Sequence, residues 1–203
     1  MEREVLAVEE RVLGAEHPDT LTAAGNLAAS LARQGKHDEA VAMQREVLAV
    51  MQRVLGAEHA DTLTAANNLA ASLKNQGKHD EAVAMGREVL AVRQRVLGAE
   101  HPDTLFTAGN LAASLAHQGK HDEAEKMQRE VLAVRKRVLG AEHPDTLSTA
   151  VNLAASLKRQ GKHDEQGSLF MCVRVCIYLL VPALVLLCAC VFACVHMMGS
   201  HEL

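Results

Sequence analysis

One stretch of 42 residues recurs along this chain with few changes. Full copies occupy residues 14–55, 56–97 and 98–139, partial copies occupy 1–13 and 140–165. A fixed period between 20 and 50 residues is typical of stacked supersecondary units, none of which can bury its apolar face alone. We therefore expect a solenoid, and we look for its function on a surface rather than in one catalytic centre.

Each copy reads as two antiparallel helices without any strand. Pro18 suits the first helical position, where its missing N–H costs nothing, and Asp19 suits the positive end of the helix dipole. Gly35 ends this first helix because glycine readily adopts the left-handed conformation. Apolar residues follow a helical period. In the first helix these are Leu21, Ala24, Leu27, Ala28 and Leu31, and in the second Ala40, Met43, Val47, Val50, Val54 and Leu55.

A change of composition divides the chain into a repeat array, residues 1–165, and a tail, residues 166–203, that holds all five cysteines. Val175 to Met198 contain no Asp, Glu, Lys or Arg, and as a helix they are long enough to cross a hydrocarbon core of about 30 Å. The preceding basic residues would then place the repeats in the cytosol. Three alternatives stay open: a membrane anchor, a cap over the last helix, or the product of a misread gene, such as a translated intron.

The sequence offers little for catalysis, metal binding or nucleic-acid binding. A net charge of −4 without a basic stripe disfavours a nucleic-acid partner. Phosphate-loop and metalloprotease motifs are missing. Two histidine series recur once per repeat, too far apart for shared metal coordination, and we expect turn and capping roles for them. The series are His17, His59, His101 and His143, and His37, His79, His121 and His163. We expect neither an enzyme nor a cofactor.

The string HPDTLxxxxNLAxxLxxQGKxxEA resembles the tetratricopeptide repeats of kinesin light chains. It spans His17 to Ala40, His59 to Ala82 and His101 to Ala124, and reaches Glu165 from His143 without its final Ala. The resemblance implies an all-α, right-handed superhelix of helix pairs that binds proteins, with kinesin heavy chain or a cargo as partners. The family's usual aromatic residues are replaced by Ala32, His37 and Gln44.

On the first helix, the copies differ at positions that the resemblance turns toward a concave groove. An unvarying asparagine stands among these sites, and its amide can both donate to and accept from a peptide backbone. A structural role for this asparagine, copied with the rest of the repeat, is the alternative. The candidate partner-binding residues are Asn26, Asn68, Asn110 and Asn152, Thr22, Thr64 and Phe106, and Arg33, Asn75, His117 and Arg159. The last four would form a mildly positive lining, unless they are simply a solvated face.

These observations favour a cytoplasmic, non-catalytic scaffold that holds an extended or helical segment of a protein partner. Two alternatives follow from the ends of the chain. The tail would make the protein a membrane-anchored adaptor with its repeats facing the cytosol. The start at Met1 falls inside a repeat, so the chain is either capped there or is a fragment, such as the detached regulatory array of a signalling NTPase.

Overall fold

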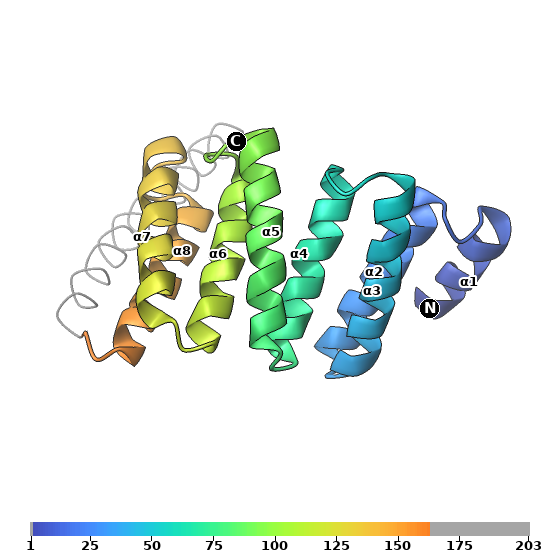
Figure 1. Ribbon diagram of the computed structural model, residues 1–203, viewed down its shortest axis with the longest axis horizontal. Helices are drawn as coiled ribbons and strands as arrows, with labels where there is room; N and C mark the ends of the chain where they lie inside the picture. Colours follow the sequence, from blue (N-terminus) through green and yellow to red (C-terminus); the bar gives the residue numbers. More distant parts are fainter. Residues whose placement is uncertain (1, 163–203) are drawn as a thin grey trace, which may run out of the picture. The chain divides into compact units, whose positions relative to one another are not determined.

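The computed structural model describes residues 2–162, and all of its regular elements in that range are helices (Figure 1). They are α1 (Glu2–Val12), α2 (Pro18–Arg33), α3 (His37–Val54), α4 (Ala60–Asn75), α5 (His79–Leu97), α6 (Pro102–His117), α7 (His121–Val138) and α8 (Pro144–Arg159). The first compact unit extends to Val131 and a second begins at Leu132. The expected all-α solenoid of helix pairs is therefore confirmed for the described residues.

In the first unit, consecutive helices from α1 to α6 pack side by side in hairpins, as the blue-to-green part of Figure 1 shows. The first helices of neighbouring repeats, α4 and α6, also contact each other directly. In this unit, α3 and α5 each pack against the first helix of their own repeat and that of the next repeat.

The predicted helix boundaries are confirmed by backbone geometry. Gly35 has φ of +80°, and the Lys36 N–H donates to the Leu31 carbonyl at 3.0 Å, which closes the end of α2 in a Schellman motif. At the other end of α2, Nδ1 of His17 accepts from the Asp19 N–H at 3.2 Å. The same cap recurs at His59, His101 and His143. The capping role expected for this histidine series is therefore confirmed.

The second helices bury two apolar faces, which a single helical stripe did not anticipate. In α3, Val47 and Met51 join a core cluster with α1 and α2, whereas Val41 and Leu48 join the next cluster with α4 and α5. Val54 belongs to the apolar positions identified in the sequence, yet its side chain is 43% exposed. The reason is that α3 fits between two first helices, so its buried surface is wider and differently centred.

In the second unit, Leu132 of α7 packs with Ala150, Leu153 and Leu157 of α8. The hydrophobic helix and membrane span expected at Val175 to Met198 lie outside the described residues. Within residues 2–162, no helix combines the length and the apolar character that a membrane crossing requires.

Candidate functional site

The predicted asparagines lie on the accessible side of the first helices. Asn26 and Asn68 are exposed and Asn110 is half-buried in the first unit, and Asn152 is exposed in the second. One turn earlier on the same helices, Thr22, Thr64 and Phe106 are also exposed. Residues four apart share one face of a helix, so each asparagine and its preceding variable residue present neighbouring side chains to solvent.

Four of these predicted residues meet in one pocket between α2, α3 and α4, with a volume of about 220 Å³. We call it the Gln44 pocket. Its rim includes Thr22, Asn26, Thr64 and Asn68, so the structure brings together side chains that are 42 residues apart in the sequence. The complete lining is Leu21, Thr22, Gly25, Asn26, Ala29, Gln44, Val47, Met51, Asp61, Thr64, Ala65 and Asn68.

The floor of the Gln44 pocket comes from α3, which the sequence reasoning had not included in the site. Val47 and Met51 are buried and apolar. Gln44 is only 7% exposed, and its Oε1 has no hydrogen-bond partner among the described residues. A buried polar atom without a partner loses its hydration without compensation. Because Gln44 lines the pocket, a rotation of its side chain would offer this acceptor to a bound donor.

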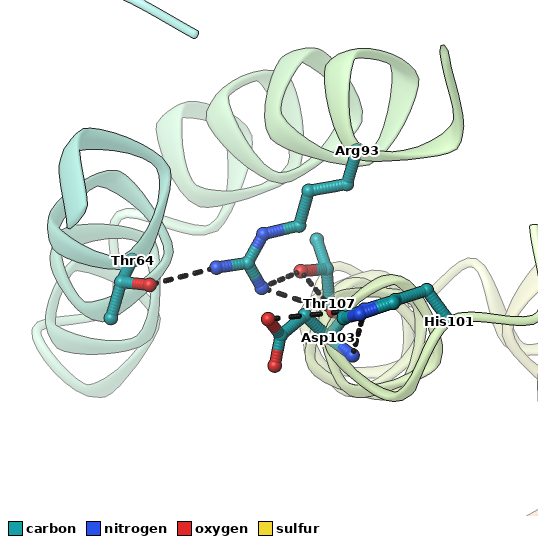
Figure 2. Close-up of polar contacts among 5 residues, drawn as sticks. All are labelled: Thr64, Arg93, His101, Asp103 and Thr107. Carbon is teal, nitrogen blue, oxygen red and sulfur yellow. Dashed lines mark hydrogen bonds and ion pairs between the residues drawn. The ribbon is translucent and has the colours of Figure 1, made fainter. Parts of the chain in front are cut away.

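We call the space formed by α2, α3 and α4, which holds the Gln44 pocket, the first interval, and that formed by α4, α5 and α6 the second interval. The second interval is arranged differently (Figure 2). Arg93 of α5 takes the repeat position of Met51, and its guanidinium bridges the two first helices. It donates to the Thr64 hydroxyl of α4 at 2.9 Å, and to the Asp103 carbonyl and Thr107 hydroxyl of α6 at 3.0 and 2.8 Å. Burial lowers the pKa of Arg93, and the charge of Asp103 partly opposes this effect.

In the second unit, the bonds from the arginine to the following first helix recur. Arg135 of α7 donates to the Asp145 carbonyl at 2.9 Å and to the Thr149 hydroxyl at 2.7 Å. In both cases an arginine on the second helix pairs with a threonine 14 residues later, whereas Met51 is followed at that distance by Ala65. This paired change between copies is visible in the sequence and points to the arginine bridge, but it lies outside the candidate residues predicted from the sequence.

The four residues proposed as a mildly positive lining do not line the Gln44 pocket. Arg33 donates to the Ser30 hydroxyl at 2.8 Å, beside a second hollow that Glu2 also lines. The ring of His117 stacks on that of His79 with centroids 5.6 Å apart. Asn75 is exposed, and in the second unit Arg159 is exposed and donates to Ser156 at 3.5 Å. Their role in partner binding stays a prediction.

Among residues 2–162, no three histidine, cysteine or acidic side chains come together as metal ligands. The Gln44 pocket offers hydroxyls, side-chain amides and the Asp61 carboxylate over a largely apolar floor. Such a surface can bind and orient a chain through hydrogen bonds and shape.

Comparison with known proteins supports the same architecture. Two crystal structures of nearly identical TPR-like repeats from a candidate kinesin light chain of Podosopora anserina, one of them a variant, are each 29% identical to this chain. Their TM-scores are 0.75 and 0.72, and the alignments cover 86% of this chain and 82% and 83% of theirs. BtubC (BKLC) from P. vanneervenii gives a TM-score of 0.69 at 25% identity, covering 86% of this chain and 68% of that one.

Comparison with curated proteins finds no match. The tetratricopeptide repeat family, in contrast, matches residues 3–53, 19–95, 61–115 and 103–165. These overlapping matches span both partial copies and all three full ones. The expected resemblance to kinesin light chain repeats is confirmed by the structural matches. On the strength of its repeats and its helix-pair fold, this chain belongs to the tetratricopeptide repeat family.

Proposed function

We propose that this chain is a non-catalytic scaffold that holds an extended segment of a partner protein along the face of α2, α4 and α6. The observation that carries the proposal is the Gln44 pocket, where exposed threonine and asparagine side chains surround an apolar floor. At about 220 Å³ it is smaller than the roughly 300–1,000 Å³ of pockets for drug-sized ligands. Its volume suits a single side chain of a longer segment.

The asparagines support a peptide rather than an isolated small molecule. Each side-chain amide offers donors and an acceptor, so it can bond either polar group of a peptide backbone. Asn26, Asn68 and Asn110 occupy the same position in three successive repeats of the first unit. A segment that crosses several repeats would meet the same amide once per repeat, and the pocket would select one of its side chains.

Selection from a random displayed-peptide library, followed by affinity measurements, tests the proposal. Peptides selected on the full chain should bind at least about tenfold more weakly when Asn26 and Asn68 are both changed to Ala, since each loses hydrogen bonds to the ligand. Arg45→Ala and Arg87→Ala, at exposed positions of α3 and α5 outside the Gln44 pocket, form the matched control. Peptides that still bind after the asparagine changes but lose binding in the control would refute binding along the face of α2, α4 and α6.

The tail carries a second proposal, that Val175 to Met198 anchor the chain in a membrane with the repeats in the cytosol. Its support is the absence of Asp, Glu, Lys and Arg from these 24 residues. Alkaline extraction of membranes should leave the full chain in the membrane pellet and release a version that ends at Glu165. Complete extraction of the full chain would exclude the anchor.

A further inference from the structure

The second interval, between α4, α5 and α6, shows how this chain holds a guanidinium. Arg93 is 3% exposed and is held by three neutral oxygens, those of the Asp103 carbonyl, the Thr107 hydroxyl and the Thr64 hydroxyl. Figure 2 shows the guanidinium between α4 on one side and α6 on the other. Because the copies are nearly identical, this arrangement predicts what the same positions can hold one repeat earlier.

In the first interval the corresponding positions are Asp61, Ala65 and Thr22. All three line the Gln44 pocket, so two of the three oxygen-bearing groups are retained without the arginine that uses them. The hydroxyl of Thr22 donates to the Pro18 carbonyl at 2.9 Å, which leaves its oxygen able to accept a second bond. Met51 replaces the arginine and ends in a thioether, which donates nothing.

Gln44 adds an acceptor that the second interval lacks, where Gly86 takes its place. Its Oε1 is buried in the floor and, within the described residues, accepts no hydrogen bond. Gln128, the equivalent residue in α7, also has an unpartnered Oε1, but its copy carries Arg135 instead of a methionine. Only the first copy therefore combines the buried acceptor with a methionine at the position of Arg93.

We infer that the Gln44 pocket binds an arginine side chain supplied by the partner protein, in the role that Arg93 fills within the next interval. This inference rests on the proposed function, since it names the partner residue that the groove selects. The aliphatic stem of the arginine would lie on Leu21, Val47 and Met51. Its guanidinium would donate to Gln44 Oε1, the Thr22 hydroxyl and the Asp61 carbonyl.

Charge and geometry favour arginine over other residues. A guanidinium has five N–H donors in a planar fork, whereas the lysine ammonium is a compact point charge with three donors. The exposed Asp61 carboxylate at the rim attracts a cation and repels an acidic side chain. Acceptors on several sides of the pocket therefore match a flat, donor-rich cation.

The direct probe is N-acetyl-L-arginine N-methylamide, with the citrulline analogue as its neutral isostere. Titration of the full chain, followed by the side-chain amide NMR signals of Gln44, Asn26 and Asn68, should show saturable shifts with the arginine probe. The citrulline probe should bind at least about tenfold more weakly, as expected when a charged hydrogen-bond donor is replaced by a neutral one. Equal binding of the two probes, or no shift with the arginine probe, would overturn the inference.

Two variants separate a specific site from general weakening. The double variant Met51→Arg with Ala65→Thr installs the pair that copies two and three already contain, so it should fold and fill the pocket with its own guanidinium. It should abolish binding of the arginine probe. Gln44→Leu, which keeps an apolar floor, should weaken binding about tenfold through loss of one acceptor. Unchanged probe binding in the double variant would place the arginine elsewhere.

The library experiment distinguishes failure of this inference from failure of the proposed function. Selected peptides that require Asn26 and Asn68 but lack an essential arginine would refute the arginine pocket and support the scaffold. If no selected peptide depends on those asparagines, the proposed function itself fails. Selected peptides whose essential arginine loses its effect in the double variant would support both.

Discussion

Changing Arg93 to Met in α5 should destabilise the first unit only modestly, although this buried side chain makes three hydrogen bonds. Each bond from a charged donor contributes roughly 1.5–3 kcal/mol. Against this loss stands the desolvation of a buried guanidinium, which costs several kcal/mol and disappears with the charge. The Thr107 hydroxyl keeps its 3.0 Å bond to the Asp103 carbonyl, and the exposed Thr64 can bond to water. Because no buried partner is stranded, we expect a net loss of about 1–2 kcal/mol.

Urea unfolding followed by circular dichroism measures this change, with a nearest-neighbour analysis because repeat arrays need not unfold in one step. Arg95→Met is the matched control, since Arg95 pairs with Glu58 at 2.6 Å on an exposed surface and should contribute less than about 1 kcal/mol. A loss above about 4 kcal/mol for Arg93→Met would refute the reasoning. It would mean that the bridge is required for stability and that Met51 is not an equivalent substitute.

Four further substitutions test the fold. Leu69→Ala, at a side chain only 1% exposed, should cost about 2–5 kcal/mol of unfolding free energy, whereas Val54→Ala should change it by less than about 0.5 kcal/mol; similar losses would contradict the revised core. Gly77→Ala places a side chain at φ of +84° and should lower the free energy of unfolding, measured by heat or urea, by roughly 1–2 kcal/mol. An unchanged stability would argue against the left-handed helix end. Arg45→Gln removes an exposed pair with Glu81 at 2.5 Å and should cost at most about 1 kcal/mol, a difference that high salt should reduce.

The sequence predicted the helix pairs well because their boundaries depend on local chemistry. Pro18 and His17 mark the start of α2 and Gly35 marks its end, each through contacts with residues close in the chain. The exposed face of Asn26 and Asn68 was also predictable, since it follows from helical periodicity and from comparison of the copies.

The floor of the site was harder to predict because it depends on contacts between helices. Gln44 looked like the loss of an aromatic residue, and only packing of α3 against two first helices shows that it is buried in a pocket. The bond of Arg93 to Thr107 joins two successive repeats, and its bond to Thr64 joins the two helices of one repeat. Comparing positions 51 and 65 together with their equivalents, rather than one position at a time, would have revealed it.

The most direct test of the central claim is a crystal structure of the full chain with the tightest-binding peptide selected from the library. We predict an extended peptide along α2 and α4, bonded to Asn26 and Asn68, with an arginine guanidinium within hydrogen-bond distance of Gln44 Oε1. A peptide seated around Arg45 and Arg87 instead, with the Gln44 pocket filled only by water, would contradict the account.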